Sequence, residues 1–143
     1  MSNSFIVLDD CCIMDKITLA GCVILKNNSI LLLNRKKTGW YELPGGKVDD
    51  GETVEIAAIR ELKEELCCDV EIVRQLGIKD FEENGFVMTY VWFLSRLKDE
   101  SQLLVGEPNK FDHFKWIPVS DLREHKLSPN MLNLVEELNL LSL

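Results

Sequence analysis

One stretch of the chain reads Leu43-Pro44-Gly45-Gly46-Lys47-Val48-Asp49-Asp50-Gly51-Glu52 and continues, after seven residues, with Arg60-Glu61-Leu62-Lys63-Glu64-Glu65. If residues 53 to 67 form a helix, Glu61, Glu64 and Glu65 stand at i, i+3 and i+4 and share one face. The sequence therefore predicts a helix that directs several carboxylates to one point beside a glycine turn.

The same helix also has an apolar face and a basic residue. Its apolar face would pack against a sheet through Ala58, Ile59, Leu62 and Leu66. Ala57 falls within the carboxylate stripe, where a small side chain would leave room for a ligand. Arg60, four residues before Glu64, can hold that carboxylate by a charge-assisted hydrogen bond and fix its direction.

The carboxylates form a set that suits a divalent cation. Like charges at these spacings cost a helix in water only about 0.2 to 0.5 kcal/mol per pair, but in a cleft they repel more strongly and a cation relieves the repulsion. Hard carboxylate oxygens without His or Cys partners favour Mg²⁺, with Mn²⁺ as the alternative, over zinc. An acidic stripe on a helix is usually its solvated face, but here the glycine turn, Glu52 and Arg60 at fixed offsets favour a metal site.

The stretch from Gly46 to Cys68 resembles the Nudix box: Gly, five residues, Glu, seven residues, Arg-Glu, an aliphatic residue, any residue, Glu-Glu, any residue, Gly and an aliphatic residue. The resemblance around the box extends from residue 17 to residue 122. Cys67 departs from the pattern because it stands where the box has glycine, and Cys68 follows where an aliphatic residue is usual. Such a glycine ends the helix in a left-handed conformation, which a residue with a Cβ adopts at a cost of about 1 kcal/mol or somewhat more. The departure bears on the helix end and leaves the acids in place.

The resemblance implies an α/β fold, a Nudix-like α/β/α sandwich with a mixed sheet, formed by residues 1–143 as a single domain. It also implies metal ligands, which are the backbone carbonyl of Gly46 and the carboxylates of Glu61, Glu64 and Glu65. Arg60 and Glu52 would orient these ligands from outside. The general base varies within the family, and the candidates here are Glu61, Glu64 and Glu107. The segment Glu107-Pro108-Asn109-Lys110 resembles a loop of MutT-like members that contributes a further acid, although an exposed loop glutamate is an equally good interpretation.

Metal ions neutralise charge on phosphoanhydride oxygens while a water attacks phosphorus, so the implied site suits a nucleotide pyrophosphatase. We expect hydrolysis of a standard or oxidised nucleoside triphosphate to a nucleoside monophosphate and pyrophosphate. The proline that commonly marks ADP-ribose enzymes after the box is absent, and the Glu83-Asn84 turn occupies its place. The alternatives are hydrolysis of ADP-ribose or another nucleoside-diphosphate sugar and, less favoured, a nucleotide-sensing Nudix module without catalysis. Candidate substrate contacts are Arg35, Lys47, Phe81 and Trp116, although aromatic residues at strand spacing are more often core.

Composition narrows the class of protein and its partners. The 143 residues, 46% of them hydrophobic, suffice for one domain with a buried core. A net charge of −8 argues against a surface that binds nucleic acid polymers. We expect a small nucleotide as the partner and leave a homodimer open. The apolar runs are too short for a membrane span or a signal peptide, so we expect the chain in the cytoplasm. The cysteines lack Cys-x-x-Cys spacing and should be reduced: Cys11, Cys12, Cys22, Cys67 and Cys68.

Alternation and turn residues predict the remaining elements. Strands 17–25 and 30–34 form a hairpin, and residues 40–43 lead into the glycine turn. The box helix begins after Thr53 as N-cap, and strands 70–81 and 86–94 form a second hairpin. A polar loop over 98–110 leads to strand 111–117 and then to a helix that begins at Ser128-Pro129 and ends near Leu140. Residues 1–16 are interpreted as an extra strand or an interface arm.

Overall fold

The computed structural model describes residues 5–8, 12–83 and 85–141. Its strands are β1 (Phe5–Leu8), β2 (Cys12–Lys26), β3 (Ser29–Arg35), β4 (Tyr41–Glu42), β5 (Gly45–Lys47), β6 (Val70–Glu83), β7 (Phe86–Leu97) and β8 (Phe111–Pro118). Its helices are α1 (Val54–Leu66) and α2 (Pro129–Leu141), with short 3-10 turns η1 (Glu100–Gln102) and η2 (Val119–Glu124). The predicted order of strands and helices is confirmed, while residues 1–4, Cys11 and Asn84 lie outside the described part.

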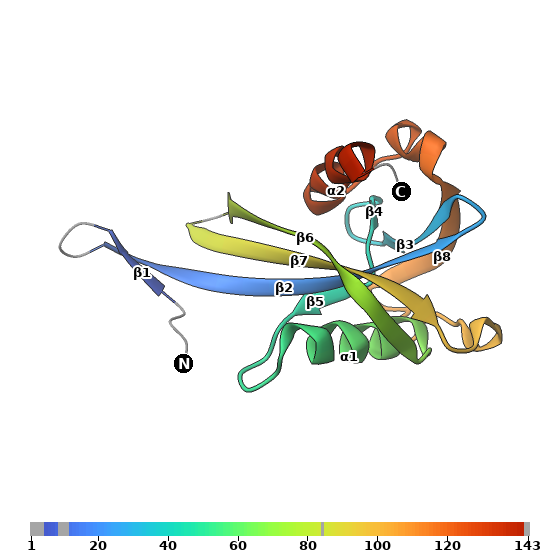
Figure 1. The fold of residues 1–143 in the computed structure, drawn as a ribbon, viewed down its shortest axis with the longest axis horizontal. Coiled ribbons are helices and arrows are strands. Elements are labelled where there is room, and N and C mark those ends of the chain that lie inside the picture. Colours follow the sequence, from blue (N-terminus) through green and yellow to red (C-terminus); the bar gives the residue numbers. More distant parts are fainter. Residues whose placement is uncertain (1–4, 9–11, 84, 142–143) are drawn as a thin grey trace.

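The strands form one mixed sheet (Figure 1). Its order is β4-β3-β2-β7-β6, with β1 and β5 paired to β2 and β8 paired to β3. β2 and β7 run parallel over residues 16–24 and 87–95, whereas the other pairs are antiparallel. β2 is longer than predicted because its first residues pair with β1, which corresponds to the extra strand, one of the two alternatives for residues 1–16. The predicted mixed sheet is therefore confirmed.

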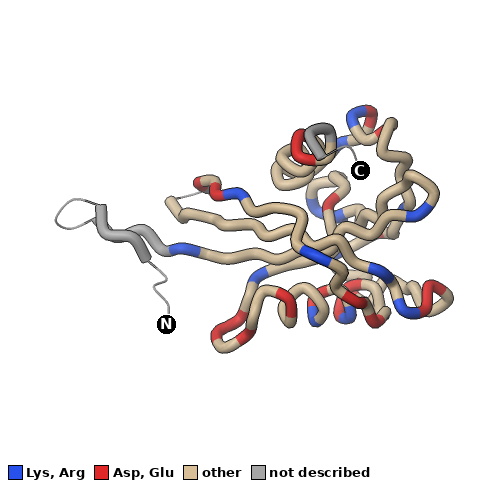
Figure 2. Tube along the Cα trace, viewed as in Figure 1, with Lys and Arg blue, Asp and Glu red and all other residues tan. Residues whose placement is uncertain are grey.

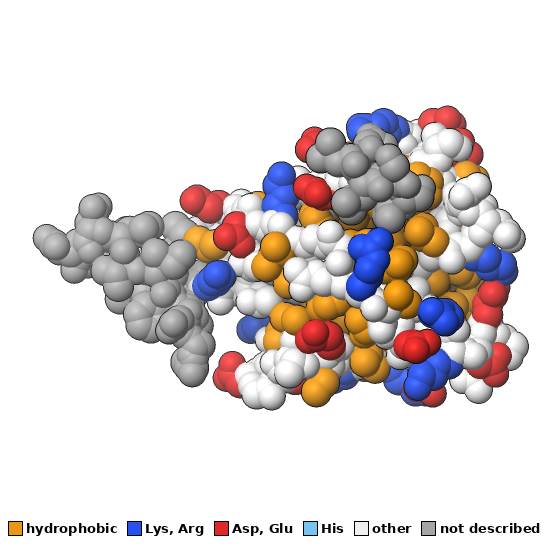
Figure 3. Space-filling view, viewed as in Figure 1, with side chains coloured by type: hydrophobic (Ala, Val, Ile, Leu, Met, Phe, Trp, Pro, Cys, Tyr) orange, Lys and Arg blue, Asp and Glu red, His pale blue; other side chains and the backbone are white. Residues whose placement is uncertain are grey.

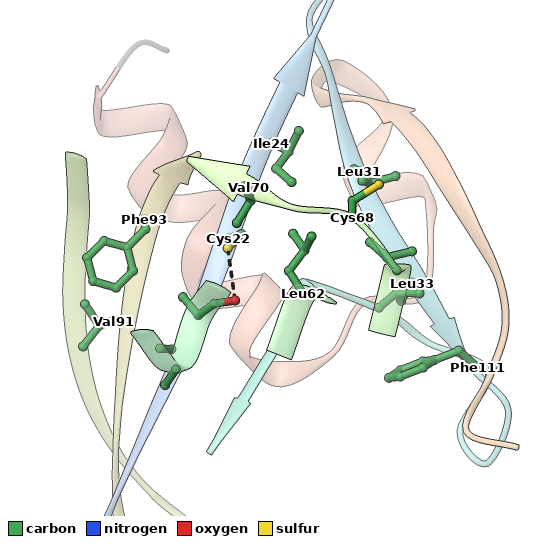
Figure 4. Close-up of a cluster of buried hydrophobic side chains, with 14 residues drawn as sticks. Cys22, Ile24, Leu31, Leu33, Leu62, Cys68, Val70, Val91, Phe93 and Phe111 are labelled. Atoms are coloured by element: carbon green, nitrogen blue, oxygen red, sulfur yellow. Dashed lines mark hydrogen bonds between the residues drawn. The ribbon is translucent and has the colours of Figure 1, made fainter. Parts of the chain in front are cut away.

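The two helices cover opposite faces of the sheet (Figure 1). On one face, Ala58, Leu62 and Leu66 of α1 pack against buried side chains of β2, β3, β7 and β8 (Figure 4). On the other face, Met131 and Leu134 of α2 pack against the opposite side chains of β2, β3 and β7. This arrangement is the α/β/α sandwich that the resemblance implies.

The helix ends follow the predicted chemistry. Oγ1 of Thr53 and Oγ of Ser128 each accept a hydrogen bond from the N–H three residues later, at 3.1 and 3.2 Å, so both predicted N-caps are confirmed. Cys67 adopts φ 61° and ψ 20°, the left-handed conformation that the box glycine would supply. Its N–H donates to the carbonyl of Lys63 at 3.0 Å. The helix therefore ends where the box predicts, at a conformational cost of about 1 kcal/mol.

The described cysteines with placed side chains are free thiols: Cys22, Cys67 and Cys68. Cys22 is fully buried in the core under α1, and its Sγ lies 3.7 Å from the carbonyl oxygen of Ala58. Burial raises the pKa of the Cys22 thiol to about 12, so this thiol stays protonated and behaves as a core residue.

β6 forms one edge of the sheet. Val73 and Ile78 on this strand are 45% and 59% exposed. Figure 3 shows hydrophobic side chains between the two helical layers on the face that it presents. In the described part of the chain, neither helix has the length and apolar character needed to cross a membrane.

Candidate active site

The glycine turn that connects β4 to β5 lies against β2. Gly45 and Gly46 pair with Gly21 and Ala20, and a Cβ on Gly45 would lie 2.3 Å from the carbonyl oxygen of Ala20. A Cβ on Gly46 would instead lie 2.6 Å from Cδ of Glu61. The missing side chains therefore let the turn contact β2 on one side and the Glu61 carboxylate on the other.

Glu65 is the most deeply buried acid of the site. The residue is 4% exposed, and its Oε1 accepts a hydrogen bond from the N–H of Gly45 at 2.9 Å. Burial is the main cause that raises the pKa of Glu65 well above its ordinary value. The Gly45 hydrogen bond opposes this change, and the charges of Glu61, Glu42 and Glu107 add to it. Negative charge is therefore concentrated where the helix meets the glycine turn.

The acidic stripe overlaps the face of α1 that packs on the sheet. At about 100° per residue, Glu65 lies within about 20° of Ala58, which is fully buried. Ala57 is also fully buried in the core, so the expectation that it leaves room for a ligand is wrong. Ile59 is 37% exposed, and its predicted place on the packing face is wrong as well. Both errors have one cause, because the packing face is rotated toward the acids and includes Glu65.

Arg60 connects the acids of the box. Its Nε and Nη2 donate to Oε2 and Oε1 of Glu52 at 2.7 and 2.9 Å. Its Nη1 donates to Glu61 and Glu64, each at 3.2 Å, and Nη2 also reaches the carbonyl of Lys47 at 3.1 Å. The hydrogen bonds from Arg60 are the main cause that lowers the pKa of Glu52 to about 2. The structure thus contains the predicted contact of Arg60 with Glu64, and it adds a contact with Glu52 that the sequence did not predict.

Glu107 lies near the box acids although it is distant from them in the sequence. Burial raises the pKa of Glu61, Arg60 opposes the change, and the charges of Glu64 and Glu107 add to it. The Glu107 side chain is 26% exposed, and its Oε2 lies 3.4 Å from Nζ of Lys110. The Glu107 side chain is therefore only partly exposed, and the neighbouring Gly106 N–H donates to the carbonyl of Glu65 at 2.8 Å, which keeps this loop at the box helix.

A second arginine–glutamate pair adjoins the cluster. Nε and Nη2 of Arg35 donate to the Glu42 carboxylate at 2.6 and 2.8 Å, and Nε1 of Trp40 donates to the same carboxylate at 2.8 Å. The bond to Glu42 is the main cause that raises the pKa of Arg35, and the charges of Glu65 and Glu107 add to it. Arg35 is therefore near the acids, as expected of a substrate contact. Sequence reasoning missed Glu42, whose only signal was an acid in the short strand before the glycine turn.

The other predicted substrate contacts do not meet at the acids. Trp116 lines a hollow of about 380 Å³ together with Lys26, whose Nζ lies 5.2 Å from the centre of the Trp116 ring. None of the acids named above lines that hollow. Phe81 packs against the core under α2. The side chain of Lys47 is exposed, and only its carbonyl takes part in the site through Arg60.

Two buried polar atoms have no hydrogen-bond partner among the described residues: Nε1 of Trp92 and Oδ1 of Asn130. Trp92 lies beside Tyr90 with ring centres 6.1 Å apart, and the Tyr90 hydroxyl would be 3.0 Å from a Cβ on Gly45. Asn130 is in the first turn of α2. The N–H of Ser128, which caps this helix, donates to the carbonyl of Tyr41 in β4 at 3.0 Å. Trp92 is fully buried in the core under α2, which leaves no surface for a ligand to contact. Asn130 is only half-buried, and because buried polar atoms are usually paired, its Oδ1 is a candidate ligand contact. The sequence carried no signal for either.

The donor set of the site fits a hard divalent cation. Carboxylate oxygens of Glu61 and Glu65 adjoin the glycine turn, and Glu64 is linked to Glu61 through Arg60. Figure 2 shows the acidic residues along α1 and the preceding loop. Within the described ranges, no three Asp, Glu, His or Cys side chains are gathered as a preformed metal cluster, and Glu61 and Glu64 instead share Nη1 of Arg60. Burial and mutual charge raise the pKa of Glu61 and Glu65, and a cation would relieve that repulsion.

Comparisons with known proteins agree with this geometry. A family model described as the NUDIX domain matches residues 16–138. The solved structure of a MutT NUDIX hydrolase from Burkholderia pseudomallei superposes with a TM-score of 0.78 at 30% identity, covering 86% of this chain and 98% of that chain.

Two curated relatives have names that point to different substrates. An ADP-ribose pyrophosphatase of Methanocaldococcus jannaschii is 39% identical over 98 residues, covering 64% of this chain and 57% of that protein. An 8-oxo-dGTP diphosphatase of Proteus vulgaris is 42% identical over 64 residues, covering 40% of this chain and 57% of that protein. In both cases the alignment spans just over half of the relative's length.

Proposed function

The chain belongs to the Nudix family of hydrolases, and on this premise we propose that it cleaves the diphosphate linkage of a nucleoside triphosphate, standard or oxidised, to a nucleoside monophosphate and pyrophosphate. The observation that carries the proposal is that Glu61 and Glu65 adjoin the glycine turn, with Glu64 linked to Glu61 through Arg60. The charge of Glu107 acts on both Glu61 and Glu65. A concentrated set of carboxylates binds divalent cations, and these cations assist cleavage of a substrate with adjacent phosphates.

In this proposal Mg²⁺ is the cofactor, with Mn²⁺ as the alternative. The residues that would hold it are Glu61, Glu64 and Glu65 together with the carbonyl of Gly46. When bound, the ion neutralises charge on phosphate oxygens and lowers the pKa of a water. Arg60 and Glu52 support the proposal because their hydrogen bonds fix the directions of Glu61 and Glu64.

We assign Glu107 as the general base that takes a proton from the attacking water, in preference to Glu61 and Glu64. Arg60 already bonds to those two carboxylates, whereas the described contacts of Glu107 leave its Oε1 without a partner. Arg35 would bind a phosphate oxygen, since its side chain is one third exposed and the charges of Glu65 and Glu107 act on it. Both assignments can be tested by substitution without disturbing the core.

Asn130 is proposed to contact the base. Its buried Oδ1 has no hydrogen-bond partner among the described residues and can accept a hydrogen bond from the edge of a nucleobase. Leaving such an acceptor unpaired costs about 1 to 3 kcal/mol, so a ligand that donates to it gains affinity and orientation.

The second candidate is hydrolysis of ADP-ribose or another nucleoside-diphosphate sugar. It is favoured by the name of the Methanocaldococcus jannaschii relative, which is 39% identical over 98 residues. The metal site would be shared by the two activities, so the difference between them would lie in the residues that contact the rest of the substrate.

One panel of substrates separates the candidates. Purified protein is incubated with (d)NTPs, oxidised dNTPs, ADP-ribose and nucleotide sugars, with and without Mg²⁺, and the products are identified. We expect monophosphate and pyrophosphate from a triphosphate, only with the metal. AMP and ribose phosphate would support the second candidate, whereas binding without turnover of any compound would indicate a nucleotide-sensing module.

A homodimer is proposed separately. Its support is the β6 edge of the sheet, where Val73 and Ile78 are exposed and a second copy would cover them. Light scattering on the wild type and on an Ile78→Lys variant tests it. A monomeric wild type at micromolar concentration would reject the proposal.

A further inference from the structure

The loop that connects β7 to β8 is fastened to the end of α1. The N–H of Leu104 donates to the carbonyl of Leu66 at 3.1 Å, and the N–H of Gly106 donates to the carbonyl of Glu65 at 2.8 Å. These bonds satisfy two of the carbonyls that the C-terminal end of a helix leaves unpaired. The loop therefore lies directly against the helix that carries the box acids.

Gly106 is needed in this loop for space and not for conformation. Its φ lies outside the left-handed region, unlike that of Gly51 or Gly85. A Cβ on Gly106 would lie 2.3 Å from the carbonyl oxygen of Glu64 and 3.1 Å from Sγ of Cys67. The first of these is a helical backbone atom, which cannot swing aside as the end of a side chain can. Any larger residue must therefore move the loop away from the helix.

Glu107 follows Gly106 directly, so its position depends on this contact. On its other side a turn holds it, because its carbonyl accepts the N–H of Lys110 at 2.9 Å. Because the N–H of Gly106 donates to the carbonyl of Glu65 at 2.8 Å, Glu107 follows one residue from the backbone of the box helix, and its charge adds to the raised pKa of Glu61 and Glu65. A loop that moved off α1 would carry this carboxylate away from the cluster.

Cys67 completes the contact from the helix side. Its thiol packs over Gly106, which the glycine of the family pattern could not do. We propose that Gly106, with Cys67 packed over it, is a positioning residue that sets the place of the Glu107 carboxylate relative to Glu61 and Glu65. The inference rests on the role in hydrolysis proposed for Glu107.

A double-mutant cycle in the full chain tests the proposal. We expect Gly106→Ala to lower kcat by about 10²-fold with little change in KM, since a displacement of about 1 Å has an effect of that size. Glu107→Gln alone should lower kcat by about 10²- to 10⁴-fold. If Gly106 acts through Glu107, the double variant should match Glu107→Gln to within about twofold. An unchanged kcat in Gly106→Ala, or effects that multiply, would overturn the proposal.

Two further variants separate positioning from folding. Gly85→Ala is a control for backbone strain without steric overlap: its φ of 83° disfavours alanine, but an added Cβ has no heavy atom within 4 Å, and kcat should stay at the wild-type value. Cys67→Ala removes only the thiol and should lower kcat about three- to tenfold, whereas Cys67→Ser should restore it. A wild-type kcat in Cys67→Ala would overturn the positioning role of the Cys67 thiol. The kcat of Cys67→Ala can be measured even if Gly106→Ala does not fold.

Amide hydrogen exchange provides a readout that does not need turnover. In the wild type the amide of residue 106 is bonded to Glu65 and should exchange slowly, and in Gly106→Ala it should exchange faster. If the wild type hydrolyses no nucleotide, the proposed function fails while this measurement still reports on the loop contact. Equal protection in both proteins would overturn the positioning role.

Discussion

Replacing Gly45 and Gly46 by alanine, one at a time, should produce two different defects, because the two Cβ atoms would meet different obstacles. At Gly45 the Cβ would lie 2.3 Å from the carbonyl oxygen of Ala20 and 2.6 Å from Cα of Gly21, both in the backbone of β2. At Gly46 it would lie 2.6 Å from Cδ and Oε2 of Glu61, at the end of a flexible side chain. Neither glycine has a positive φ, so space alone decides the outcome.

The size of each defect follows from what has to move. Gly45→Ala must push β5 off β2, and forced overpacking of this kind costs about 1 to 3 kcal/mol. For a domain of this length each kcal/mol lowers Tm by about 2 to 4 °C, so Tm should fall by about 2 to 12 °C. Gly46→Ala only rotates the Glu61 carboxylate away, which should leave Tm within about 2 °C of the wild type. It should nevertheless lower kcat by about 10²-fold, because a proposed metal ligand is displaced.

Thermal unfolding is measured with a chelator present, so that metal binding does not change Tm. Turnover is measured as pyrophosphate release with Mg²⁺. Gly85→Ala is the control for kcat only: an added Cβ there has nothing within 4 Å, but its φ of 83° strains alanine, so its Tm should fall while its kcat stays at the wild-type value. If Gly46→Ala lowers Tm as much as Gly45→Ala, or keeps the full kcat, then Glu61 does not lie against the turn and the reasoning fails.

Four other substitutions test separate parts of the site. Glu64→Gln should lower kcat by about 10²-fold or more, because a proposed metal ligand loses its charge. The circular dichroism spectrum should stay unchanged, since this side chain is half exposed. Full turnover would reject Glu64 as a ligand. Arg60→Ala should release Glu52, whose pKa Arg60 holds at about 2. A carboxylate whose pKa is lowered by folding stabilises the folded protein at pH values above its ordinary pKa, and this stabilisation is lost as the pH falls toward 2. The free energy of unfolding of the variant, measured with urea, should therefore depend less on pH between about 5 and 2. Cys67→Gly should be about 0.5 to 1 kcal/mol more stable in urea than Cys67→Ala, since glycine alone avoids the left-handed penalty. Asn130→Ala should raise KM in initial-rate measurements with little effect on kcat, and an unchanged KM would remove Asn130 from the base site.

Features that depend on neighbours in the sequence were predicted correctly. The caps at Thr53 and Ser128 use a side chain and an N–H three residues apart, so the sequence shows both partners. The approach of Arg60 to Glu64 likewise follows from helical spacing. The strands were identified from alternation, although their ends differ by a few residues because pairing with distant strands extends them.

Features that depend on distant contacts were not predicted. The burial of Ala57 depends on how α1 is rotated on the sheet, which packing with β2 decides. The pairing of Arg35 with Glu42 depends on the register between β3 and β4. Trp116 was placed near the substrate by analogy, but it lies on the half of β8 that pairs with the start of β3, beside Lys26. In each case the missing information was a register or rotation that no local pattern encodes.

Glu65 contacts two loops, and the bond made by its side chain gives a physical reason for burying an acid on the packing face of α1. Its Oε1 accepts the N–H of Gly45 at 2.9 Å, and its carbonyl accepts the N–H of Gly106 at 2.8 Å. The first bond fixes the glycine turn, and the second fixes the loop that carries Glu107. A leucine at position 65 would fill the same space but leave the Gly45 N–H buried without a partner, at a cost of about 1 to 3 kcal/mol. The apolar pattern of the helix is therefore interrupted at the one buried position whose side chain must accept a hydrogen bond.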